Sequence, residues 1–175
     1  MTPRSATARK LTEIPDGIVR GADCSPNCAE CPFSTKDGKP TKPVPGEGPE
    51  KPAWIVLGEG PGRTEIMLGR PFVGPSGQLF ERVLAANQVE RENIWVTNST
   101  LCIPMGRKKT DTELVKAREA CRPRLEAELA RFPGIPILAL GGVATNALLG
   151  DEFKISQIAS SLQDVDVDGS GERPI

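Results

Sequence analysis

A short apolar run followed at once by a glycine-rich turn is the feature that most constrains the fold of this chain. Residues 54–57 read Trp-Ile-Val-Leu, and residues 58–62 read Gly-Glu-Gly-Pro-Gly. An apolar run of this length between Pro52 and a glycine is typical of a buried parallel strand. Ligands of open α/β sheets bind outside the carboxyl ends of such strands, where glycines allow close backbone approach. The pattern therefore predicts that Glu59 projects into a ligand-binding crevice.

Apolar segments with the two periodicities of secondary structure alternate along the rest of the chain. We expect strands at 54–57, 94–98 and 135–140, and helices at 76–87, 111–131 and 143–149. Thr110 and Glu113 have the spacing of a capping box at the start of the longest helix. This alternation predicts an α/β fold, a three-layer α/β/α sandwich with a short central parallel sheet.

Two segments outside this pattern are rich in turn-forming residues. Residues 1–51 contain many prolines and glycines, which predicts a loop-rich N-terminal arm ahead of an α/β domain at 52–175. The tail at 164–175 alternates Asp with Val and then reads Gly-Ser-Gly, which fits a polar hairpin or a frayed end.

The composition limits the classes of function. With 175 residues, 38% of them hydrophobic and 26% charged, the chain is large enough for one folded core and is not a disordered polymer. A net charge of -1 gives no overall attraction to polyanions. Contacts with nucleic acid must therefore come from local basic clusters, and the run Arg107-Lys108-Lys109 is a candidate for phosphate binding.

The chain has five cysteines and no histidine. Residues 1–10 are polar and basic, without the apolar core of a secretory signal, and no long apolar stretch predicts a membrane span. We therefore expect a cytoplasmic protein, in which cysteines bind metal more often than they form disulfides. Without histidine, any such site has only thiolate ligands, and the spacing leaves structural zinc and an iron–sulfur cluster open. Cys24 is the odd residue of the set.

Several motifs in order make the segment from Cys28 to Leu149 resemble the uracil-DNA glycosylase superfamily, most closely its iron–sulfur-containing family 4. The motifs are a Gly-Glu-x-Pro-Gly loop, a Gly-x-Pro-Phe-Val-Gly segment, a strand that ends in Thr-Asn with a cysteine four residues later, a Cys-x-Pro triplet and an Ala-Leu-Gly segment. In this chain they are residues 58–62, 69–74, 97–102, 121–123 and 139–141.

The resemblance implies a role for individual residues. Glu59 corresponds to the carboxylate near the attacking water, Phe72 to the ring on which a flipped uracil stacks, and Asn98 to the amide that reads the uracil edge. It also implies a 4Fe-4S cluster, with zinc as the less favoured alternative, bound by Cys28, Cys31, Cys102 and Cys121. The other implied contacts to base and DNA backbone are made by Gly58, Gly60, Pro61, Gly62, Val73 and Gly74, with Val73 and Gly74 offering backbone amides to the base.

One departure from this family leaves the activity open. The family carries a late His-Pro-Ser motif, whereas this chain has no histidine, and we expect it to be a truncated part of a longer polypeptide. The resemblance implies a DNA glycosylase that acts in base excision repair on DNA containing uracil or a modified base. The alternative is a non-catalytic iron–sulfur nucleic-acid-binding module, part of a larger replication protein. Electron transfer is disfavoured, because the cysteines are spread across a folded domain.

Overall fold

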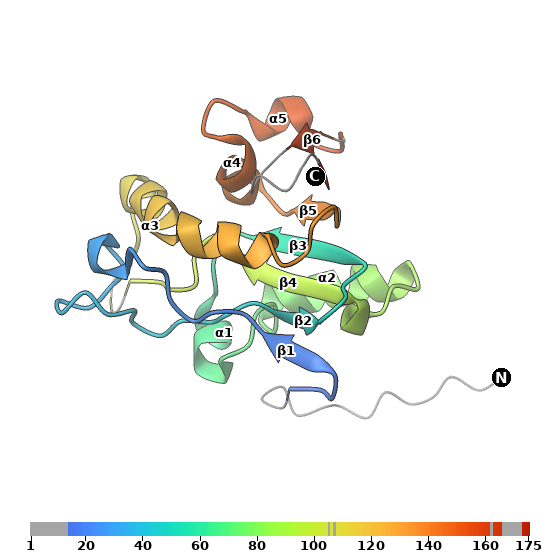
Figure 1. Ribbon diagram of the computed structural model, residues 1–175, viewed down its shortest axis with the longest axis horizontal. Coiled ribbons are helices and arrows are strands. Elements are labelled where there is room, and N and C mark those ends of the chain that lie inside the picture. Colours follow the sequence, from blue (N-terminus) through green and yellow to red (C-terminus); the bar gives the residue numbers. More distant parts are fainter. Residues whose placement is uncertain (1–13, 105, 107, 162, 166–172) are drawn as a thin grey trace.

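The computed structural model describes residues 14–104, 106, 108–161, 163–165 and 173–175, and Figure 1 shows their arrangement. The strands are β1 (Ile18–Arg20), β2 (Glu47–Pro49), β3 (Trp54–Gly58), β4 (Ile94–Asn98), β5 (Ile137–Ala139), β6 (Asp164–Val165) and β7 (Arg173–Pro174). The α-helices are α1 (Arg63–Leu68), α2 (Pro75–Ala86), α3 (Asp111–Leu129), α4 (Gly142–Leu149) and α5 (Ile155–Ile158). Short 3-10 helices are η1 (Cys28–Glu30) and η2 (Arg91–Asn93).

The central sheet has five strands in the order β1-β2-β4-β3-β5. The predicted parallel core is confirmed, because β3 pairs in parallel with both β4 and β5. The sheet as a whole is mixed, since β2 adds antiparallel to β4 and β1 antiparallel to β2. Both added strands come from the arm predicted to be loop-rich, and each has only three residues, too few for a periodic signal. The domain division at residues 51 and 52 stays a prediction.

Alternating side chains of β3 and β4 build the two faces of the sandwich. Ile55, Leu57 and Trp95 pack against α3 and α4 in one cluster. Val56 lies on the opposite face, in a second cluster with Phe80 and other residues from α2. Because neighbouring strand residues point to opposite faces, this split confirms the three-layer α/β/α arrangement (Figure 1).

The ends of the elements differ slightly from the sequence prediction. Thr110 and Glu113 form the expected capping box at the start of α3. The helix ends earlier than predicted because the amides of Arg131 and Phe132 bond to carbonyls three residues back, which tightens the last turn. The tail forms the antiparallel pair β6–β7, and its turn at 166–172 lies outside the described residues. None of the described helices has the length and apolar composition to span a membrane.

A buried carboxylate joins α3 to the sheet. Glu128 accepts hydrogen bonds from Trp95 Nε1 at 2.8 Å and from Thr97 Oγ1 at 3.0 Å, both on β4. Arg124, one turn earlier on α3, pairs with the same carboxylate, and the two side chains are 1% and 2% exposed. A buried charge is tolerated only when it is paired and hydrogen-bonded, and here both conditions are met.

The guanidinium of Arg124 also fixes the carboxyl end of β4. Its Nη2 donates to the carbonyl oxygen of Asn98 at 2.7 Å and to that of Ser99 at 3.2 Å. Both carbonyls lie where the strand leaves the sheet, so the sheet ladder alone does not hold them. The buried pair therefore braces the backbone that presents Asn98.

Replacing Arg124 with methionine leaves the Glu128 carboxylate buried without its cation. We expect Arg124→Met to lower the free energy of unfolding by about 3–5 kcal/mol, measured by urea denaturation. Arg122→Met is the matched control, because Arg122 pairs with Glu126 at the same helical spacing while both side chains are about half exposed. A surface pair contributes about 0.5 kcal/mol or less, so equal losses in the two variants would contradict the argument.

Candidate functional site

A cavity of about 450 Å³ lies at the carboxyl ends of β3 and β4. These two strands end in register, with Gly58 beside Asn98. Most of the residues singled out from the sequence line this cavity: Gly58, Glu59, Gly60, Pro61, Gly62, Phe72 and Asn98. The structure thus brings together an acidic side chain, an aromatic ring and a carboxamide from three separate segments.

Gly58 allows the ring and the amide to converge. A Cβ at this position would lie 2.5 Å from Asn98 Oδ1 and 2.8 Å from Phe72 Cζ. The Asn98 side chain is buried, at 3% exposure. Any larger residue than glycine at the end of β3 would therefore separate the carboxamide from the aromatic ring.

The backbone of Phe72 is held in an unusual conformation. Its φ is 55°, in the left-handed region that non-glycine residues rarely adopt. The first turn of α2 packs directly against it, because a Cβ on Gly77 would overlap the Phe72 carbonyl group. The ring also packs against Phe80 at a centroid distance of 5.7 Å. Strain of this kind persists only where surrounding contacts enforce it, and it clusters at functional sites.

Glu65 is a structural centre of the site that the sequence analysis missed. Its carboxylate accepts hydrogen bonds from the amides of Gly62 and Val73, each at 3.0 Å, and from the amide of Gly74. One buried carboxylate therefore ties the glycine-rich loop to the segment that carries Phe72. The sequence feature that indicates this role is the capping-box spacing between Gly62 and Glu65. It is a weak indication, because the N-cap residue is a glycine and has no side chain to complete the box.

The contacts of Glu65 bear on two of the implied base contacts, which stay predictions. The resemblance implied that Val73 and Gly74 offer their backbone amides to the base. In the structure both amides donate to Glu65 instead, and neither residue lines the cavity. Their contribution is to hold the Phe72 loop in place.

Glu59 lies at the mouth of the cavity with a fixed backbone and an accessible side chain. Its carbonyl oxygen accepts hydrogen bonds from Ser99 Oγ at 2.6 Å and from the amide of Thr100 at 3.1 Å. Its carboxylate forms an ion pair with Lys109, and the two side chains are 41% and 35% exposed. Lys109 belongs to the basic run singled out from the sequence, of which Arg107 lies outside the described residues.

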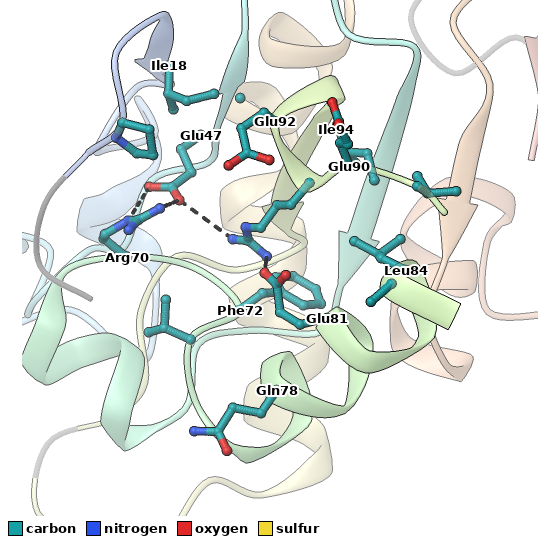
Figure 2. A pocket seen from close by; sticks show the side chains of 16 residues that line it. Ile18, Glu47, Arg70, Phe72, Gln78, Glu81, Leu84, Glu90, Glu92 and Ile94 are labelled. Carbon is teal, nitrogen blue, oxygen red and sulfur yellow. Dashed lines mark hydrogen bonds and ion pairs between the residues drawn. The ribbon is translucent and has the colours of Figure 1, made fainter. Parts of the chain in front are cut away.

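The far side of the Phe72 loop is held by a second charged network, shown in Figure 2. Glu47 on β2 is 2% exposed and accepts hydrogen bonds from Arg70 Nε at 3.1 Å. Arg91 donates to the carbonyl of Pro71 at 2.8 Å and forms an ion pair with Glu81 on α2 at 3.2 Å. These groups border a cavity of about 600 Å³ that Phe72 also lines, so the segment just before Phe72 is tied to η2 through Arg91 and to β2 through Arg70.

The four cysteines expected to bind a cluster are electrostatic neighbours. Burial raises the pKa of the Cys102 thiol to about 11, with Cys121 and Cys31 adding to the rise and hydrogen bonds with Thr41 opposing it. Burial also raises the pKa of Cys31, with Cys121 and Cys28 acting in the same direction. Segments far apart in the sequence therefore bring these thiols to one region. Cys24, the odd residue, is exposed.

Packing already anchors the arm that carries the first two cysteines. Phe33 is 1% exposed and lies in a cluster with Leu101, Leu114 and Ala117. Ser25 Oγ donates to the carbonyl of Ala120 at 2.6 Å, next to Cys121. An aromatic anchor and a buried hydrogen bond therefore hold this arm against the rest of the domain, beside any tie made by the proposed ligands Cys28 and Cys31.

The donor set fits an all-thiolate centre, since two half-buried and two buried thiols act on one another electrostatically and the chain has no histidine. Within the part of the chain that the structure describes, no three His, Cys, Asp or Glu side chains form a group positioned to hold a metal ion. A single zinc ion needs all its ligands around one point, whereas a cluster spreads them over several irons. Ligation by these cysteines stays a prediction.

Comparison with known proteins agrees with this site. A family model of the uracil DNA glycosylase superfamily matches residues 45–169. A type-4 uracil-DNA glycosylase of Pyrobaculum aerophilum is 37% identical over 123 residues, which are 70% of this chain and 60% of that protein. A type-4 uracil-DNA glycosylase of Archaeoglobus fulgidus is 36% identical over 61% of this chain and 56% of that protein.

A third relative is matched over more of its length. The type-4 uracil-DNA glycosylase of Thermotoga maritima is 30% identical over 153 residues, which are 87% of this chain and 73% of that protein. The chain thus spans between about half and three quarters of the length of these relatives. The family model covers well over half of the chain, and its span includes the whole cavity-lining set. The chain belongs to the uracil DNA glycosylase superfamily.

Proposed function

We propose that this protein removes uracil from DNA by hydrolysing the bond between the base and deoxyribose. The convergence of Glu59, Phe72 and Asn98 on one cavity carries this proposal, and the names of the relatives support it. A base inside a duplex is out of reach of such a cavity. The target nucleotide therefore leaves the base stack, or lies in a single strand, before it reacts.

Phe72 and Asn98 are the groups that bind the base. The ring of Phe72 offers an apolar face on which a planar base stacks. A carboxamide presents one donor group and one acceptor, so Asn98 pairs with both O4 and N3–H of uracil. Cytosine reverses these two groups and is rejected, because a buried amide would be left facing like partners. Gly58 and the braced end of β4 keep the amide and the ring in register.

Glu59 supplies the charge that the reaction needs. Breaking an N-glycosidic bond develops positive charge on the sugar, as in glycoside hydrolysis, and a carboxylate nearby stabilises that charge. The same carboxylate orients or deprotonates the attacking water. Its position at the cavity mouth, with its backbone held by Ser99 and Thr100, suits a group that faces the sugar and not the base.

Removing either polar group tests this assignment. We expect Glu59→Gln to slow uracil release from single-stranded DNA about 100-fold or more, and Asn98→Asp to slow it at least about tenfold because the amide donor is lost. Abasic sites are counted after alkaline cleavage. Glu119→Gln and Asn87→Asp are the matched controls, since both residues are exposed and neither lines the cavity. Tight DNA binding without any base release would favour the non-catalytic module instead.

We also propose that Cys28, Cys31, Cys102 and Cys121 bind a 4Fe-4S cluster. The all-thiolate donor set and the shared region of the four cysteines support it. When bound, the cluster adds a covalent tie between the arm and α3. Phe33 and Ser25 bring the two segments together by packing and hydrogen bonding without it.

Metal analysis of variants tests the cluster. We expect the purified protein to contain iron and sulfide, to absorb visible light, and to lose both properties in Cys102→Ser. The Cys24→Ser variant is the control, because Cys24 is exposed and is not one of the proposed ligands. Zinc in place of iron after anaerobic reconstitution, or equal iron in both variants, would reject the assignment.

A further inference from the structure

We propose that Lys109 is a positioning residue that couples phosphate binding to the release of the Glu59 carboxylate. The inference rests on the proposed function, because it assigns a regulatory contact within that same site. Lys109 and Glu59 line the same cavity, and the ammonium group of one is paired with the carboxylate of the other. In this arrangement the carboxylate is occupied before any nucleotide enters.

Hydrogen bonds hold the backbone of Glu59 and that of the residue next to Lys109. Lys109 directly precedes the capping box of α3, in which the Thr110 amide donates to Glu113 at 3.0 Å. The carbonyl of Glu59 is held by Ser99 and Thr100. Any change of partner is therefore a movement of the two side chains alone, which needs no rearrangement of the fold.

The exposure of the pair makes it exchangeable. Its side chains are 35% and 41% exposed, and an ion pair in such surroundings contributes little because water and salt screen it. The buried pair of Arg124 and Glu128, with side chains 1% and 2% exposed, is closed to an anion from solvent. The two pairs thus have different roles: the Arg124–Glu128 pair stabilises the fold, whereas the Lys109–Glu59 pair can be broken by a competing anion.

A nucleotide entering the cavity brings that competing anion. With its base against Phe72 and Asn98, the phosphodiester groups on either side of its sugar lie toward the mouth, where Lys109 is. When the Lys109 ammonium group leaves Glu59 and pairs with a phosphate, the Glu59 carboxylate becomes free to face water and the sugar. Substrate binding itself then uncovers the charge that the reaction needs.

Binding measurements on a double-mutant cycle test this coupling. Affinities for a uracil-containing single-stranded oligonucleotide are measured by fluorescence anisotropy over a salt series for the wild type, Glu59→Gln, Lys109→Met and the double variant. We expect Glu59→Gln to bind about two- to five-fold more tightly, because Lys109 no longer has a competing partner. That gain disappears when Lys109 is methionine. The slope of log affinity against log salt falls by about 0.7 in Lys109→Met, as expected for one lost phosphate contact to a single strand.

The neighbouring lysine provides the control for general charge effects. Lys108 precedes Lys109 in the sequence but does not line the Glu59 cavity, so Lys108→Met keeps the full gain from Glu59→Gln. Lys109→Arg keeps both the gain and the salt slope. A gain that persists without Lys109, or an unchanged salt slope in Lys109→Met, overturns the proposal. The cycle measures binding alone, so its result remains valid even if the protein releases no base. A failure to release base would count only against the proposed function.

Discussion

The parallel pairing of β3 with β4 is the constraint on which the site depends. Their register places Gly58 beside Asn98, and the missing side chain of Gly58 leaves the space in which Phe72 approaches the amide. A slip of one residue would turn Asn98 to the α3 face, because successive residues of a strand point to opposite sides. The network of Arg124 and Glu128 bonds to the same strand, so the helix packed behind the sheet sets the position of Asn98.

Charged groups act in two different ways in this small domain. Glu65, Glu47 and Glu128 are buried, and each is used to hold backbone or arginine groups in one geometry. Glu59 instead lies in the cavity with a part-exposed side chain, paired with the part-exposed cation Lys109. The two kinds of carboxylate depend on each other. The Glu59 carboxylate can change its partner and keep its position in the cavity only because other contacts hold the backbone that carries it.

The sequence was sufficient to predict the parallel core of the sheet and most of the residues that line the cavity. Apolar runs located β3 and β4, and the glycine-rich turn located the loop that carries Glu59. It was insufficient where residues distant in the sequence cooperate: Glu65 reaches Gly74 nine positions away, and Glu128 reaches Trp95 across 33 positions. A buried glutamate on an amphipathic helix has no local signature that separates it from an exposed one. The short β1 and β2 were missed for a related reason, since pairing with β4 and not local propensity makes them strands.

The packing of the cysteine-bearing arm bears on how the two proposals relate. Phe33 and Ser25 attach the arm to α3, and α3 in turn carries the arginine that braces Asn98. A cluster bound between arm and helix would stiffen this attachment near the middle of α3, while the cavity lies at the carboxyl ends of β3 and β4. The two regions share the helix but no residue: none of the four cysteines lines the cavity. A cluster held by these cysteines would therefore reach the cavity through α3, as a structural tie that adds to the contacts of Phe33 and Ser25.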